Sequence, residues 1–151
     1  MRDNSERLKA IQTHASALTA SAARRPAADM LIELDALQRE LSTADASRVE
    51  AYVAAVFAVV AGFSALGRAQ KMGPLLERAI GICRAGSKQQ LLRRALSLYG
   101  YFTGDIINAP RALGCLQEAV ELARDMNDPV AEVSNVVNLG VVLTNIGWDD
   151  N

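Results

Sequence analysis

The chain repeats its own apolar pattern at a fixed interval, and this repeat limits the possible folds more than any other feature. Residues 76–84 match residues 116–124, and the same shift places residues 99–100 over 139–140. We call this alignment the repeat register. Few residues are identical, but the apolar positions match nearly throughout, and a looser match places Gly62 over Gly100. An interval of about 40 residues lies in the range of about 20–50 that is typical of stacked units, each of which buries only part of its apolar surface.

The segments between turn signals carry the periodicity of α-helices. In the first segment, Leu8, Ile11, Ala15 and Leu18 follow one another at spacings of three and four, as on one face of a helix. No segment alternates with a period of two, and Ala and Leu, both strong helix formers, carry most of the apolar content. The sequence therefore predicts an all-α fold with seven helices, at about 5–22, 26–41, 48–66, 71–85, 88–102, 109–127 and 129–146.

Polar residues and prolines mark the expected helix starts. Two segments have the spacing of a capping box, in which side chains at both ends bond the first free amides of a helix. Two others have an Asn or Asp shortly before a proline, as is typical of a cap followed by the first helical turn. The pattern predicts capping boxes at 47–50 and 87–90, and cap residues at Asn108 and Asp128.

Charge and apolar content exclude several classes of protein. With 16 basic and 17 acidic residues the net charge is -1, so no electrostatic basis for binding nucleic acid or anionic lipid is evident. Residues 51–67 are uncharged, but this stretch falls short of the about 20 residues that a membrane span needs, so a buried helix is expected. The charged N-terminus does not resemble a signal peptide. Cys83 and Cys115 lack metal-site spacing and are expected to be buried thiols of a cytoplasmic protein.

Residues that could carry catalysis or hold a cofactor are scarce. His14 is the only histidine, so neither a metal cluster nor a nucleophile–histidine pair is expected. The glycines do not form a phosphate-binding loop. Asp149 and Asp150 are expected to begin a helix, where carboxylates favour the positive end of the dipole. The sequence predicts no enzyme, metal or cofactor, although a fold alone never excludes an activity.

The last two segments resemble the tetratricopeptide repeat. Leu139-Gly140 matches the Leu-Gly pair of that repeat, Gly147 matches the glycine that ends its first helix, and Leu116 between two alanines matches its second helix. Val136 and Leu143 replace the usual Trp and Tyr, and the interval is longer than that of the family. Longer, degenerate repeats of this kind resemble those of bacterial signalling proteins, such as regulators of the maltose-activator type and diguanylate cyclases.

This resemblance implies a solenoid of antiparallel helix pairs, forming one domain over residues 1–151 at the N-terminal part of a longer regulator. In the family, the first helix of each pair lines a concave groove that binds a protein or peptide partner. The alternative is that Asn138 and Asn145 only satisfy nearby backbone groups and that Arg94 is only a solvated charge. The residues expected to face the groove are Phe63, Arg94, Ser97, Tyr101, Ser134, Asn138 and Asn145.

The last segment supports a second hypothesis, that the chain is a scaffold for homodimers. Its apolar residues leave several sides of the helix without polar cover, so a second copy could pair with it and bring output domains, such as diguanylate cyclases, together. The expected self-association face comprises Val137, Val141, Val142, Ile146 and Trp148. Alternatively, residues 148–151 are the turn and cap of a helix that continues beyond Asn151 and covers this face. Both hypotheses stay open at this point.

Overall fold

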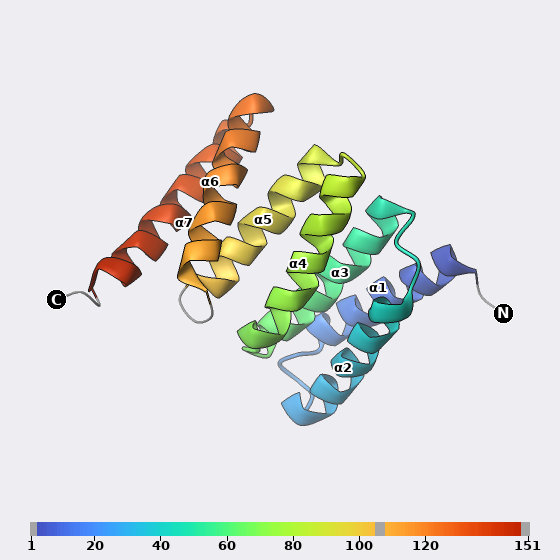
Figure 1. Ribbon diagram of the computed structural model, residues 1–151. Coiled ribbons are helices and arrows are strands. Elements are labelled where there is room, and N and C mark those ends of the chain that lie inside the picture. Colours follow the sequence, from blue (N-terminus) through green and yellow to red (C-terminus); the bar gives the residue numbers. More distant parts are fainter. Residues whose placement is uncertain (1–2, 105–107, 149–151) are drawn as a thin grey trace. The chain divides into compact units, whose positions relative to one another are not determined.

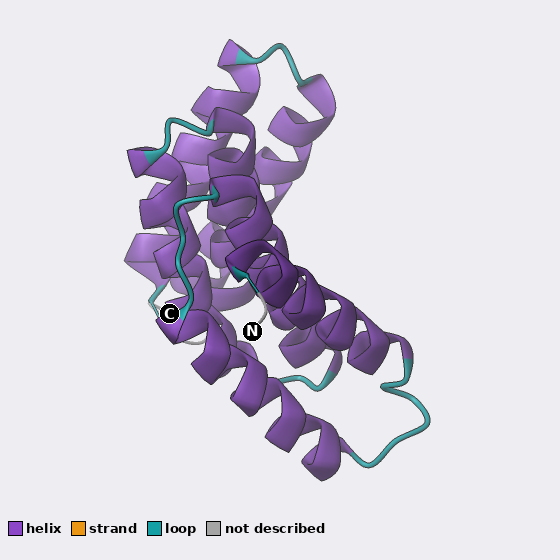
Figure 2. Cartoon of the chain, turned by 90° about the vertical axis from the view of Figure 1, so that its right-hand side faces the viewer, coloured by secondary structure: helices purple, strands orange, loops and turns teal. Residues whose placement is uncertain are grey.

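The structure, a computed structural model, is built from α-helices connected by short turns (Figures 1 and 2). It describes residues 3–104 and 108–148, with side chains up to residue 146. No strand occurs within these ranges, so the prediction of an all-α fold is confirmed. The helices in these ranges are α1 (Asn4–Ala20), α2 (Ala27–Thr43), α3 (Val49–Ala65), α4 (Ala69–Ala85), α5 (Gln89–Thr103), α6 (Ala109–Asp125) and α7 (Pro129–Trp148).

The predicted helices agree with the observed ones to within a few residues at most ends. Pro26 directly precedes α2 instead of lying in its first turn. Pro74 lies inside α4, which begins at Ala69, slightly before the predicted start. Gly147 does not end the last helix, because α7 runs to Trp148. The predicted turn and cap after Trp148 fall on residues 149–151, which lie outside the described residues.

The chain divides into two compact units, Met1–Leu75 and Leu76–Asn151, and the boundary falls inside α4. In the first unit, α3 packs against both α1 and α2. α3, which carries no charge after Glu50, forms the centre of this unit, with Tyr52, Val56 and Phe63 fully buried. The Tyr52 hydroxyl donates a hydrogen bond to the carbonyl of Leu41, at 2.9 Å. The prediction that this stretch is a buried helix is confirmed, while the prediction of a single domain stays a prediction.

The second unit depends on a close approach between α5 and α6. α6 packs against both α5 and α7. Where α5 and α6 meet, a Cβ atom added to Gly100 would overlap Cγ of Leu116 and lie 2.7 Å from its Cδ2, so only glycine leaves room for this leucine. Gly62 in the first unit lies under Leu34 in the same way, with Cδ2 at 2.6 Å. Gly140 on α7, the repeat equivalent of Gly100, has no described atom within 4 Å of its added Cβ.

Three of the turns between helices share one local structure. Gly67, Ser87 and Asn127 adopt positive φ angles of 68°, 55° and 53°. In each case the following residue donates its amide to the carbonyl five positions earlier, at 2.9, 3.0 and 2.9 Å. This is the Schellman motif, in which a left-handed residue, most often glycine, ends a helix.

Two of the four predicted helix caps form. Ser87 adopts the left-handed conformation and the cap position falls to Lys88, without a side-chain bond. Ser47 bonds Asp45 instead of a helix amide, and Arg48 takes the cap position. Both predicted capping boxes are therefore wrong. The caps at Asn108 and Asp128 are confirmed, because their side chains accept hydrogen bonds from backbone amides three positions on.

We predict that Ser87→Gly stabilises the protein. A non-glycine residue in the left-handed region is strained by roughly 1–2 kcal/mol, and glycine removes this strain at a smaller cost in unfolded-state entropy. The free energy of unfolding should rise by about 0.5–1 kcal/mol, measured by denaturant titration with circular dichroism. Ser134→Gly, at an exposed position inside α7, is the control and should lower it by about 0.5 kcal/mol. A loss of stability in Ser87→Gly would contradict the strain argument.

We predict opposite effects of alanine at two equivalent glycines. Gly100→Ala places a methyl group against Leu116, and overpacking of this kind costs about 1–3 kcal/mol. Gly140→Ala meets no described atom within 4 Å. It also removes a helix-interior glycine, so it should stabilise by about 0.5–1 kcal/mol. Thermal and denaturant unfolding of both variants measures the difference. Equal changes in the two variants would show that Leu116 does not require the glycine.

Candidate functional site

The predicted groove residues on α5 and α7 lie mostly on the outer surface of the second unit. On α5, Arg94 and Tyr101 are exposed and Ser97 is half-buried. The Ser97 hydroxyl donates to the backbone carbonyl of Arg93, at 2.8 Å. On α7, Ser134 and Asn145 are exposed and Asn138 is half-buried. The prediction that these residues contact one ligand stays a prediction.

The prediction for Phe63 needs correction. Its side chain is fully buried in the first unit, where α3 packs against α1 and α2. α3 has apolar residues on most of its circumference, so the sequence offers little contrast between an inner and an outer face. Phe63 therefore belongs to the core of the first unit and does not line an open surface.

The predicted self-association residues divide between surface and core. Val137 and Val141 are exposed, and Ile146 is half-buried. Val142 is buried, and its Cγ2 would lie 2.5 Å from a Cβ added to Gly104. Val142 thus faces the end of α5 and is not part of a surface, which corrects the prediction. The side chain of Trp148 lies outside the described residues.

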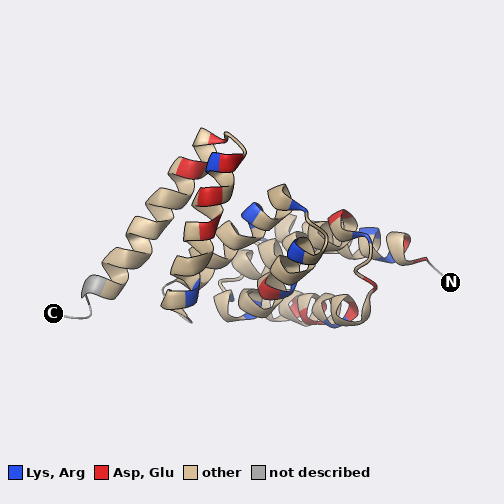
Figure 3. Ribbon diagram, turned by 45° about the horizontal axis from the view of Figure 1, so that its top comes forward, with Lys and Arg blue, Asp and Glu red and all other residues tan. Residues whose placement is uncertain are grey.

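The exposed side of α7 carries most of the exposed large apolar side chains among the described residues. Six of them, 47–80% exposed, lie on this helix, whereas in the rest of the described chain only Ile32 and Tyr101 are large, apolar and exposed. Glu132 is the only charged residue between 129 and 148, and most of the α7 ribbon in Figure 3 carries no charge colour. We call this surface the apolar face of α7; it comprises Val130, Val133, Val136, Val137, Val141 and Leu143.

The self-association set expected from the sequence lacks four members of this face, namely Val130, Val133, Val136 and Leu143. Helical spacing could have identified the first two, because positions four and seven before Val137 lie on the same side of a helix. Val136 and Leu143 are seven positions apart, so these two residues also lie on the same side of the helix as each other. The exposure of these residues is a tertiary property that spacing alone does not give.

Two surface pockets occupy equivalent places in the repeat. The first, of about 260 Å³, lies where α4 turns into α5 and is closed by two residues of α6, Glu118 and Leu122. The second, of about 370 Å³, lies where α6 turns into α7. The repeat register pairs five lining residues of the first pocket with those of the second. The first set is Arg84, Ser87, Lys88, Gln89 and Leu92, and the second is Arg124, Asn127, Asp128, Pro129 and Glu132.

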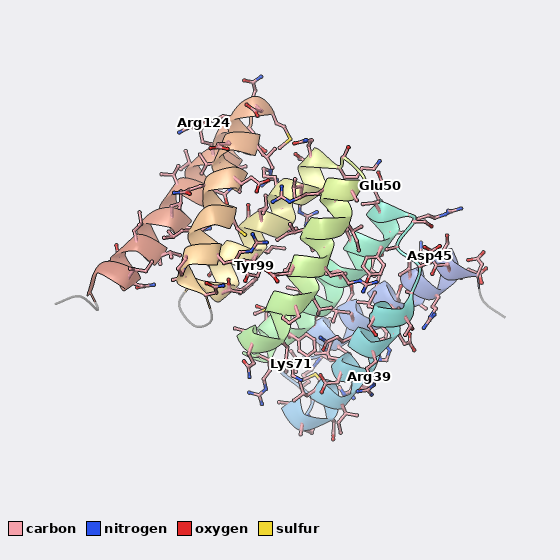
Figure 4. The ribbon with its side chains drawn as sticks, viewed as in Figure 1. Arg39, Asp45, Glu50, Lys71, Tyr99 and Arg124 are labelled. Atoms are coloured by element: carbon pink, nitrogen blue, oxygen red, sulfur yellow. The ribbon has the colours of Figure 1, made fainter. Side chains whose placement is uncertain are left out.

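The arginines of the two pockets bind carboxylates differently. Nη1 and Nη2 of Arg84 each donate to an oxygen of Glu118 on α6, both at 2.6 Å. Arg124, at the corner between α6 and α7 (Figure 4), donates through Nε to Glu132 on α7, at 2.6 Å. The side chain of Arg124 is 62% exposed, and its terminal nitrogens make no hydrogen bond to the residues that the structure describes. Arg124 therefore retains the two donors that Arg84 uses to bind a carboxylate.

The groups with catalytic or ligating potential have ordinary structural roles. Nε2 of His14 lies 3.1 Å from Glu33 Oε1, and the hydrogen bonds from His14 and then Arg25 lower the pKa of the Glu33 carboxyl. Cys83 and Cys115 are free and buried, and burial raises the pKa of both thiols. Over the described residues, no three His, Cys, Asp or Glu side chains gather as a metal site would require.

The fold and these surfaces define an all-α chain in which one helix, α7, exposes most of the large apolar side chains that the described residues leave on the surface. Comparisons with protein-family models, with curated proteins and with solved structures found no match. By length and composition alone, one described helix segment, Pro129–Ile146, could cross a membrane, and 17% of it is buried in the structure. The prediction of a buried α3 is confirmed, so the apolar surface that needs an explanation is that of α7.

We predict that both cysteines resist modification in the folded protein. A thiol reacts as the thiolate, and burial both blocks access and raises the pKa of Cys83 and Cys115. Reaction with an aromatic disulfide reagent at about pH 8 should be at least about tenfold slower than in denaturant, where both thiols react freely. A variant with an added exposed thiol, Ser134→Cys, should show one fast-reacting group. Fast reaction of the unmodified protein would contradict the burial.

Proposed function

We propose that this chain is a non-catalytic protein-interaction module that binds a protein partner through the apolar face of α7. The observation that carries the proposal is the exposure of six large apolar side chains on one helix. Soluble proteins rarely expose a contiguous apolar patch of more than a few hundred Å², and larger patches mark interaction sites. The resemblance to tetratricopeptide repeats, whose helices present binding surfaces, supports the same class of function.

The arrangement of α7 supports binding of another helix rather than of a small molecule. Small-molecule sites are concave and bury most of the ligand, whereas the apolar face is one side of a helix. Val130, Val133, Val137 and Val141 follow one another at spacings of three and four. Such a row is complementary to the apolar face of a partner helix.

The second candidate function is a scaffold for homodimers, as the sequence suggested. Gly140 lies in the exposed side of α7 with no described atom near its added Cβ, so two copies of α7 could cross closely at this point. A twofold dimer uses the same surface on both subunits. This candidate uses the apolar face as the first does and differs only in the identity of the partner.

We predict that a photo-crosslinking amino acid at Val137 captures one discrete partner in the cell of origin. The matched control is Ile32, which is 67% exposed but has no exposed large apolar neighbour on α2. Addition of Val133→Glu should abolish the product from Val137, because a charge in an apolar interface costs several kcal/mol. Mass spectrometry of the product separates a homodimer from a different partner.

The same experiment can overturn the proposal. Identical products from Val137 and Ile32, or no product from Val137, would show that the apolar face of α7 binds no protein. A product that persists with Val133→Glu would show that the contact lies elsewhere on the molecule.

A further inference from the structure

The outer side of α7 presents a stripe whose repeat equivalent on α5 is buried. The repeat register pairs Leu96 with Val136, Gly100 with Gly140, and Thr103 with Leu143. On α5 the leucine and the threonine are fully buried, and a leucine of α6 covers the glycine. On α7 the two equivalent side chains are 47% and 56% exposed, and no described atom covers Gly140. We call these three residues of α7 the open stripe: it has the form of a helix-binding site that no helix among the described residues covers.

Arg124, the charged residue beside the open stripe, has an equivalent on α4 in the same repeat register. α6 provides both the leucine that covers Gly100, which is Leu116, and, two positions later, the carboxylate that binds Arg84. Arg124 is the repeat equivalent of Arg84, and its terminal nitrogens bond no described acceptor. A helix placed on α7 as α6 is placed on α5 would bring a carboxylate to Arg124.

We propose that the open stripe and Arg124 together bind an amphipathic helix of a partner protein, with a leucine over Gly140 and a Glu two positions later at Arg124. This rests on the proposed function, and it names the chemistry of the partner. The apolar contact supplies most of the binding energy, as in other grooves that accept a helix. The bidentate ion pair fixes the register and direction of the bound helix.

The sequence argues against a second folded copy as this partner. Three Leu-x-Glu segments occur in the chain, ending at Glu33, Glu77 and Glu118. Each of these carboxylates already has a partner: Glu33 pairs with Arg25 and is hydrogen-bonded to His14, Glu77 pairs with Arg111, and Glu118 pairs with Arg84. A second copy would have to break one of its own pairs to occupy the site, whereas a helix of another protein would not.

The chain itself provides the probe for a test. A fluorescent peptide of residues 109–125, with Cys115→Ser to prevent oxidation, carries the required leucine and Glu118 at the correct spacing. Fluorescence anisotropy against the 151-residue chain should show saturable binding. Glu118→Lys in the peptide, or Arg124→Glu in the protein, should each weaken binding at least about tenfold, as expected for a charge-assisted bidentate pair. Combining the two changes should restore most of the affinity.

A second variant tests the contact between the peptide's leucine and Gly140, which does not involve charge. Gly140→Ala adds a methyl group that meets no described atom within 4 Å, so the protein stays folded. The peptide's leucine is expected to approach Gly140 as closely as Leu116 approaches Gly100. The added methyl group should therefore weaken binding about tenfold. Gly81→Ala on α4, an equally open glycine away from the stripe, is the matched control and should leave the affinity unchanged.

Three results would overturn this proposal. Absence of peptide binding would refute the helix chemistry, and a discrete crosslinked partner at Val137 would then still support the proposed function. Binding that is indifferent to Arg124→Glu would refute the role of the charge. Binding that is lost with Arg84→Ala but kept with Arg124→Glu would show that the peptide displaces α6 from α5 instead of binding to α7.

Discussion

The close contact between Leu116 and Gly100 is the constraint on which the rest of the second unit depends. A Cβ at Gly100 would overlap the leucine side chain, so the backbones of α5 and α6 approach more closely than two ordinary side chains would allow. This approach positions α6 so that Arg111 reaches Glu77 at 3.0 Å and Glu118 reaches Arg84. Two ion pairs then join α4 and α6, one with its arginine on α4 and the other with its arginine on α6. Neither pair would form if α6 were displaced along its axis by one turn.

Helix positions could be predicted from the sequence because they depend on local signals. Apolar spacings of three and four, with Asn108 and Asp128 as caps, placed the helices to within a few residues. The two capping boxes failed for different physical reasons. Ser47 bonds Asp45 instead of a helix amide, and the linker between α4 and α5 is so short that the end of one helix competes with the start of the next. Ser87 is needed in the left-handed conformation to end α4, where its side chain cannot also serve as the cap of α5.

The candidate site was only partly predictable, because burial is decided by neighbours that are distant in the sequence. Periodicity showed that Val137 and Val141 share a side of α7, but α7 is apolar on nearly every side, so it could not show which side is covered. Val142 is buried because Gly104 at the end of α5 leaves room for it. Phe63 is buried because α3 is enclosed in the first unit. Neither neighbour is evident from the residues around Val142 or Phe63.

The ion pair between Arg124 and Glu132 does not oppose the binding of a helix to the outer side of α7. The two residues have side-chain exposures of 62% and 31%, and water and salt screen an exposed ion pair of this kind, so it contributes little to stability. The pair uses Nε alone, so an incoming carboxylate can bind the terminal nitrogens without breaking it. Burial of the valines of the apolar face of α7 removes them from water, which contributes roughly 25 cal/mol of binding free energy per Å² of buried apolar surface. In the proposed complex, burial of the apolar face provides the driving force, and Arg124 selects among the helices that could bind there.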